Sequence, residues 1–179
     1  MLKKIAIIGA ESTGKTQLCQ DLAAHYQVHW CPEFAREYLL MHGREYDYDD
    51  LEIIAKGQVA LEESYIHRSI SENKDFLFID TDMYIMKVWS EYVYNRCPFY
   101  ILEQIVLRKY DLYLFTDIDI PWQKDELREY PDLKSRRELY FMYKDCLINQ
   151  NTPWHLVSGH AAQRTRNAIA MLVRAFSYT

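Results

Sequence analysis

An eight-residue segment near the N-terminus constrains the fold more than any other part of this 179-residue chain. The segment fits the pattern G-x-x-x-x-G-K-[ST] at every position. It follows a short apolar run over 3–8 and opens a predicted helix over 14–26, so it has the strand–loop–helix context that this pattern requires. Its members are Gly9, Ala10, Glu11, Ser12, Thr13, Gly14, Lys15 and Thr16.

The composition of this loop predicts that it binds phosphate. Backbone N–H groups of such a loop point inward around an anion, and glycine permits the backbone angles and the close approach. The helix N-terminus adds partial positive charge. Lys15 is placed to reach the β- and γ-phosphates, and the Thr16 hydroxyl to ligate Mg²⁺. We therefore expect the eight residues to bind ATP, with Mg²⁺ as the second cofactor.

The rest of the chain alternates between predicted strands and predicted helices. Apolar strands are predicted over 3–8, 28–31, 75–80, 110–116 and 154–157. Helices are predicted over 14–26, 34–41, 49–68, 83–94, 99–108, 138–149 and 161–176. Five apolar strands separated by helices predict an α/β fold in three α/β/α layers around a five-stranded parallel sheet. With no repeats or linkers, residues 1–179 are expected to form a single domain.

Charge and cysteine usage exclude several classes of protein. The net charge is −5, so no basic field favours nucleic acid. No apolar run approaches the roughly 18 residues of a membrane span, so no membrane insertion is expected. The four cysteines show no C-x-x-C spacing, which argues against a zinc site or a redox motif. Dispersed thiols in a domain of ordinary size predict a cytoplasmic location.

Acidic residues follow the second and third predicted strands. Asp80 ends the third strand, where it could hold Mg²⁺ together with Thr16. Asp82 could bond a substrate hydroxyl, or it could cap the helix that begins at 83. Glu33 follows the second strand and could orient the acceptor hydroxyl and accept its proton, or it could complement a helix dipole. Arg36, one turn further on, could pair with Glu33 or with a substrate oxygen.

Three further groups of residues are candidates for binding. The charged segment over 118–137 is expected to form a helical lid in which Arg128 closes over the phosphates as a catalytic residue, although a solvated helix fits the same charges. Gly159 follows the fifth strand, either as an adenine contact or as a simple turn. Tyr84, Trp89 and Trp122 could bind a planar substrate base, or they could belong to the core.

Taken together, these segments resemble one family over essentially the whole chain. GAESTGKT, PEFAREYL, DTDMYIMKVWSEYVY, DIDIPWQKDELRE and VSGHAAQRTRNA are similar to the nicotinamide riboside kinase domain of the NadR type. The resemblance implies a P-loop kinase-like fold and transfer of the ATP γ-phosphoryl to the ribose 5′-hydroxyl of nicotinamide riboside, which gives nicotinamide mononucleotide. It also implies Mg²⁺ dependence and an aromatic clamp on the nicotinamide ring.

The sequence departs from the resemblance in two respects. Asn95-Arg96 stands where a glycine-containing turn is expected, and there is no H-x-G-H nucleotidyl-transfer motif. The 179 residues also leave no room for the DNA-binding and adenylyltransferase domains of the multifunctional members, so those roles are not expected.

Two other functions stay open at the level of sequence. A deoxynucleoside or nucleoside-monophosphate kinase would share the phosphate loop, but a monophosphate acceptor needs arginines on the acceptor side, where Arg36 and Arg44 stand. A non-catalytic ATP-binding regulatory module would not need the acids after the strands. The exact acceptor, the choice between Glu33 and Asp82 as base, and the oligomeric state are also open.

Overall fold

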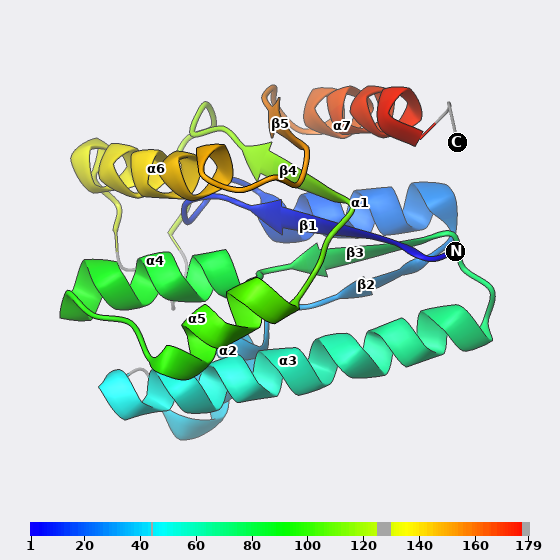
Figure 1. The fold of residues 1–179 in the computed structure, drawn as a ribbon. Coiled ribbons are helices and arrows are strands. Elements are labelled where there is room, and N and C mark those ends of the chain that lie inside the picture. Colours follow the sequence, from blue (N-terminus) through cyan, green and yellow to red (C-terminus); the bar gives the residue numbers. More distant parts are fainter. Residues whose placement is uncertain (44, 125–129, 177–179) are drawn as a thin grey trace.

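A five-stranded parallel sheet forms the centre of the molecule (Figure 1). The computed structural model describes residues 1–43, 45–124 and 130–176. The strands are β1 (Lys3–Ile8), β2 (His29–Cys31), β3 (Phe76–Asp80), β4 (Leu112–Thr116) and β5 (Trp154–Val157), in the spatial order β2-β3-β1-β4-β5. Because every pairing is parallel, the carboxyl ends of all five strands meet at one edge, where ligands of such sheets bind. The predicted fold class is confirmed.

Helices cover both faces of the sheet, which gives the three predicted layers. One face is covered by α1 (Lys15–Tyr26) and α7 (Ala162–Phe176). The other is covered by α3 (Tyr48–Ser71), α4 (Met83–Tyr94) and α6 (Leu133–Ile148). Two shorter helices, α2 (Phe34–His42) and α5 (Phe99–Leu107), pack against α3 and α4 in a third apolar cluster.

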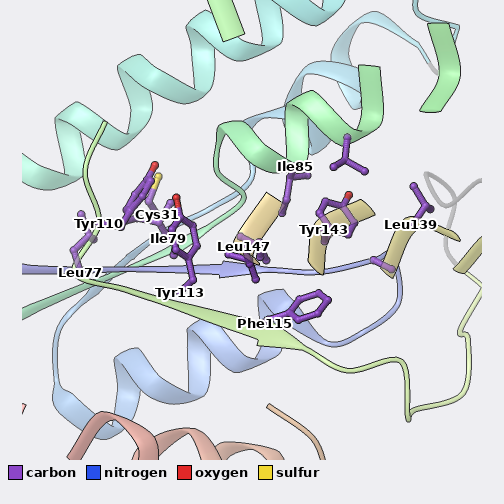
Figure 2. Close-up of a cluster of buried hydrophobic side chains, with 14 residues drawn as sticks. Cys31, Leu77, Ile79, Ile85, Tyr110, Tyr113, Phe115, Leu139, Tyr143 and Leu147 are labelled. Atoms are coloured by element: carbon purple, nitrogen blue, oxygen red, sulfur yellow. The ribbon is translucent and has the colours of Figure 1, made fainter. Parts of the chain in front are cut away.

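Successive side chains of a strand point into two different apolar clusters, one on each face of the sheet. In β1, Ile5 and Ile7 belong to the cluster under α1 and α7, whereas Ala6 and Ile8 belong to the cluster on the opposite face. Figure 2 shows the latter cluster, in which Ile85 of α4 and Tyr143 of α6 lie against the sheet. Burial on both faces explains why the three central strands, β1, β3 and β4, are almost continuously apolar.

The start of α6 differs from the prediction. The helix begins at Leu133 rather than 138, so residues 133–137 of the expected lid belong to α6, and of these five only Arg136 is buried. The reason is a helix cap: the Asp132 carboxylate accepts a hydrogen bond from the Ser135 backbone N–H at 2.8 Å. In the described remainder of the lid, 118–124 and 130–132, no residue is helical. Arg128 lies outside the described residues.

Two further expectations can be compared with the structure. None of the described helices has the length and apolar character needed to cross a membrane. All four cysteines are free thiols: Cys19, Cys31, Cys97 and Cys146.

Candidate active site

The phosphate-binding loop over residues 9–16, called the P-loop below, has the backbone conformation that the sequence pattern predicts. Gly9 has a φ of +147° and Gly14 has a φ of +77°, both outside the range that most L-residues adopt. A Cβ at Gly9 would lie 2.3 Å from the Thr116 hydroxyl oxygen, so only glycine allows the end of β4 to approach the loop. Glycine is therefore required at Gly9 for packing as well as for conformation.

Thr116, which the sequence analysis did not single out, braces the P-loop from β4. Its hydroxyl donates to the Ile8 carbonyl at 3.1 Å and lies 2.7 Å from the Thr13 hydroxyl. The Thr13 hydroxyl in turn lies 2.7 Å from the Ala10 carbonyl. A threonine that ends an apolar strand gives no sequence signal for this role.

Lys15 lies across the mouth of the loop. Its ammonium donates to the Gly9 carbonyl at 3.0 Å and to the Ala10 carbonyl at 3.1 Å. Lys15 is also the first residue of α1, whose first turn contains no acidic residue. An ammonium and a helix N-terminus at the same place form a binding site for an anion such as a phosphate.

Thr16 and Asp80 meet beside the loop, as predicted for a metal pair. The Thr16 hydroxyl donates to Asp80 Oδ2 at 2.5 Å. Asp80 is fully buried, and within the described part of the chain its Oδ1 has no hydrogen-bond partner. Burial, and then the charge of Glu33, raise the pKa of Asp80 to about 6, against the opposite effects of Lys15 and Thr16.

This donor pair fits a hard divalent cation such as Mg²⁺. An orphaned buried carboxylate oxygen beside a hydroxyl supplies the oxygen ligands that such a cation prefers. Across the described ranges, no group of three or more His, Cys, Asp or Glu side chains could hold a metal. The pair therefore suits a cation that is carried largely by the phosphates of a nucleotide.

Asp82 is placed as a helix cap. Its Oδ1 accepts from the backbone N–H groups of Tyr84 at 3.0 Å and Ile85 at 3.2 Å, so the cap that the sequence left open is present. Its burial raises its pKa to about 7, although the Tyr113 hydroxyl and the two N–H groups stabilise the charged form. Thr81, between the two acids, adopts φ +82°, which is strained for a β-branched residue. Asp82 does not line the cavity described next.

One continuous cavity of about 760 Å³ runs along the carboxyl edge of the sheet and passes the P-loop. One end is formed by the β5–α7 loop and the start of α7, and the other by α2, α4 and α6. The first end includes His160, Ala161, Arg164 and Thr165; the second includes Glu33, Arg36, Leu39, Ile85, Trp89, Tyr92, Leu139 and Tyr143. The cavity is therefore continuous from a nucleotide end, beside the P-loop, to a second end suited to an acceptor.

The acceptor end brings together three of the predicted residues. Glu33 is the N-cap residue of α2, but its side chain makes no cap hydrogen bond. Arg36 and Trp89 line the same end. The Trp89 indole N–H donates to the Tyr46 hydroxyl at 2.8 Å, which fixes the ring. Tyr92, which the sequence analysis did not single out, also lines this end, and its spacing does not distinguish it from aromatic residues of the core.

Two predicted aromatic contacts lie elsewhere. Tyr84 packs into the core, with its ring centroid 5.8 Å from that of Tyr113. Trp122 is absent from the cavity lining, and its indole nitrogen is buried without a hydrogen-bond partner among the described residues. The structure therefore does not bring Tyr84 and Trp122 together with Glu33 and Trp89.

At the nucleotide end, an arginine holds the loop that contains Gly159. Gly159 has φ +103° and its N–H donates to Asp119 Oδ2 at 2.6 Å, so it makes a turn and does not itself line the cavity. The buried Arg164 pairs with Asp119 and donates to the carbonyls of Gly159, at 2.9 Å, and Val157, at 3.1 Å. No pattern in the sequence distinguishes Arg164 from other helical arginines.

The described part of the lid segment is bonded to the P-loop. The Gln123 N–H donates to the Ser12 hydroxyl at 2.8 Å, and the Tyr130 N–H donates to Glu11 Oε2 at 3.3 Å. Ile120 is among the lid residues that line the cavity. Glu11 and Ser12, predicted as nucleotide contacts, thus also hold the lid segment over the loop.

Comparison with known proteins agrees with this arrangement. The family model described as AAA domain matches residues 4–164. The chain belongs to the AAA domain family. In this family member, the matched range begins in β1 and ends at Arg164, so it contains the P-loop and nearly all of the cavity lining.

Two curated relatives are bacterial proteins. The chain is 27% identical over 154 residues to the trifunctional NAD biosynthesis/regulator protein NadR of Escherichia coli K12, and 26% identical over 154 residues to NadR of Salmonella typhimurium LT2. Each match covers 84% of this chain and 37% of the relative. The chain therefore matches little more than a third of the length of these relatives.

Solved structures share the fold. A crystal structure of NadR protein in complex with NR superposes with a TM-score of 0.80 and 22% identity, over 98% of this chain and 50% of that chain. A thymidylate kinase from Ehrlichia chaffeensis superposes with a TM-score of 0.68 and 14% identity, over 96% and 98%. The fold is thus that of P-loop kinases.

Proposed function

We propose that the chain transfers the γ-phosphoryl group of ATP to the ribose 5′-hydroxyl of nicotinamide riboside, which gives nicotinamide mononucleotide and ADP. The observation that carries this proposal is the continuous cavity that joins the P-loop to Glu33 and to an aromatic wall formed by Trp89 and Tyr92. The structural likeness to NadR bound to NR and the sequence similarity to NadR support the choice of acceptor. The free thiols support a cytoplasmic location for the reaction.

The chemistry follows from the placement of the side chains around the P-loop. Lys15 and the loop N–H groups stabilise the charge that spreads over the transferring phosphoryl group. Thr16 and Asp80 would hold Mg²⁺, which supplies neutralisation of phosphate charge when it is bound. The acceptor oxygen forms a bond to the γ-phosphorus while the bond to the β–γ bridging oxygen breaks, and ADP leaves. The role of Arg128 in covering the phosphates stays a prediction.

Glu33 is the better candidate for the base that receives the acceptor proton. It lines the acceptor end, and among the described residues its carboxylate has no hydrogen-bond or ion-pair partner. The carboxylate of Asp82 is instead occupied by two N–H groups of α4 and by Tyr113. We therefore assign the orientation of the 5′-hydroxyl to Glu33 and the capping of α4 to Asp82.

The aromatic wall supports a planar, positively charged acceptor ring. Trp89 and Tyr92 lie one turn apart on α4 and both line the acceptor end. A cationic pyridinium ring gains cation–π attraction from such faces in addition to apolar contact. Arg36, at the same end, is placed to bond a ribose oxygen.

A nucleoside-monophosphate kinase is the second candidate, because the thymidylate kinase superposes over 98% of its own chain. A monophosphate acceptor carries about two negative charges and needs several cationic side chains. Of the described residues that line the acceptor end, Arg36 alone is cationic. This charge balance favours a nucleoside over a nucleotide as acceptor.

A coupled assay of ADP formation with a panel of acceptors tests the proposal. With ATP and Mg²⁺, nicotinamide riboside is expected to give the highest kcat/KM, above thymidine and thymidylate. Turnover of thymidylate without turnover of nicotinamide riboside would favour the second candidate. Tight ATP binding without turnover of any acceptor would favour a regulatory module.

A further inference from the structure

Gln58 is a buried amide in the middle of α3, with an exposed fraction of 1%. Burying an amide is costly unless its donor and acceptor groups are hydrogen-bonded. Its Oε1 accepts from the Phe34 backbone N–H at 2.7 Å, and its Nε2 donates to the Pro32 carbonyl at 3.3 Å. Nε2 also lies 3.7 Å from Cys31 Sγ. All of its partners therefore belong to the junction between β2 and α2.

The two backbone partners of Gln58 are the peptide groups on either side of Glu33. The Pro32 carbonyl belongs to the peptide that enters Glu33, and the Phe34 N–H belongs to the peptide that leaves it. Bonding both groups to one rigid amide fixes the φ and ψ of Glu33, which are −74° and 117°. The direction in which the Glu33 side chain leaves the backbone is thereby fixed as well.

Gly57 completes the same contact. The Phe34 ring occupies the place where a Cβ of Gly57 would stand, since that Cβ would lie 2.1 Å from Phe34 Cε1. Glycine in a helix interior costs about 1 kcal/mol relative to alanine, so its presence here has a packing reason. Gly57 and Gln58 together hold the segment 32–34. The Phe34 ring packs on Gly57, and the Phe34 backbone N–H donates to Gln58 Oε1.

From this geometry we infer that Gln58 is a positioning residue for the Glu33 carboxylate in phosphoryl transfer, an inference that rests on the proposed function. No described side chain bonds the Glu33 carboxylate, so its position depends on the backbone that Gln58 holds. Misplacement of a reacting group by about 1 Å can cost about 100-fold in rate. Gln58 acts without touching the substrate, because it does not line the cavity.

A double-mutant cycle tests this inference. Gln58→Met keeps the side-chain length and removes both hydrogen bonds, and Glu33→Gln removes the carboxylate that they position. We expect Gln58→Met to lower kcat by about tenfold or more, with KM for ATP changed by less than about twofold. In the Glu33→Gln background, the same change is expected to lower kcat by less than about twofold. An equal loss in both backgrounds would overturn the inference.

Two further variants separate positioning from general damage. Glu62→Gln changes another buried polar residue of α3, whose partners are Lys4, Arg108 and Tyr110. Its effect is expected to be the same in both backgrounds. Gly57→Ala displaces the Phe34 ring while it keeps Gln58, so it provides a second test if Gln58→Met does not fold. Its loss of kcat is likewise expected to vanish in the Glu33→Gln background, and persistence of that loss would contradict the inference.

Crystal structures of the wild type and Gln58→Met give a readout that does not depend on turnover. We expect the Glu33 carboxylate to move relative to Lys15 in the variant, and an unchanged position would overturn the inference. If the wild type phosphorylates no nucleoside, the proposed function fails, while the position of the carboxylate still decides whether Gln58 holds it.

Discussion

Lys15 carries the positive charge that the proposed reaction needs most at the P-loop. Its ammonium already lies at the loop mouth, 3.0 Å from the Gly9 carbonyl. Removing a preorganised group that stabilises transition-state charge costs about 10²–10³-fold in kcat. We expect Lys15→Ala to lower kcat by at least this factor. Lys3→Ala, which changes the half-exposed ion pair with Asp111, is the matched control and should leave kcat unchanged. Activity of Lys15→Ala within tenfold of the wild type would contradict this role.

Asp82 makes the stability of the fold depend on pH. Its pKa is raised from 3.8 to about 7, first by burial, so the folded protein holds this proton more tightly than the unfolded chain. The resulting stabilisation is complete below pH 3.8 and is lost as the pH rises through about 7. The difference in pKa corresponds to about 4 kcal/mol, at 1.36 kcal/mol per unit.

Asp82→Asn tests this dependence because asparagine keeps the helix cap and is neutral at every pH. Urea unfolding with EDTA present should show that the wild type loses free energy of unfolding relative to the variant between about pH 4 and pH 7. A constant difference between the two proteins across that range would contradict the buried acid.

At the scale of elements, the packing of α2 on α3 depends on a glycine. A change from glycine to alanine inside a helix normally stabilises it by about 0.5–1 kcal/mol. At Gly57 we expect the opposite sign, a loss of about 1–3 kcal/mol, because the new methyl group overlaps the Phe34 ring. Ser64→Ala on the exposed side of the same helix should change the free energy of unfolding by less than about 0.5 kcal/mol. Stabilisation by Gly57→Ala in urea unfolding would contradict the packing.

Elements whose signals are local could be predicted from the sequence. The bounds of α4, 83–94, follow from its apolar spacing and its cap, and the P-loop follows from a complete motif. The predicted start of α6 was wrong because the charges over 133–137 fit a lid as well as a solvated helix, and the Asp132 side chain caps the helix before them. Of those five residues only Arg136 is buried, and it donates to the Ile120 carbonyl at 3.1 Å, a contact between segments that no local pattern reveals.

Parts of the candidate site depend on contacts between distant segments. Gln58 acts on the backbone of a loop 24 residues away, and Arg164 bonds the carbonyl of Asp117. In both cases the partner is a backbone group, which almost every residue type has, so the sequence gives no signal for the contact. The residues that end each strand could be placed at one edge because a parallel sheet brings them there, but which aromatic rings face the cavity could not.

At the scale of the whole molecule, the cavity joins the two helical layers across the carboxyl edge of the sheet. Thr165 from the α7 side and Trp89 from the α4 side line the same space. Ligands that bind only the folded state stabilise it by about 2.7 kcal/mol at a concentration of 100 times Kd. We expect ATP to raise Tm more with Mg²⁺ than with EDTA.

Asp80→Asn is expected to remove most of the Mg²⁺-dependent part of this shift, because the orphaned carboxylate oxygen is lost. Asp111→Asn, at the amino end of β4, serves as the control and should keep it. Equal shifts with and without Mg²⁺ in the wild type would contradict a metal role for Thr16 and Asp80.

Product analysis by mass spectrometry tests the central claim most directly. Wild-type protein, ATP, Mg²⁺ and nicotinamide riboside should yield nicotinamide mononucleotide and ADP in equal amounts, and 5′-deoxy nicotinamide riboside should yield neither. Glu33→Gln should form the same product much more slowly. ADP formation without nicotinamide mononucleotide, or equal ADP formation with the 5′-deoxy compound, would contradict phosphoryl transfer to the 5′-hydroxyl.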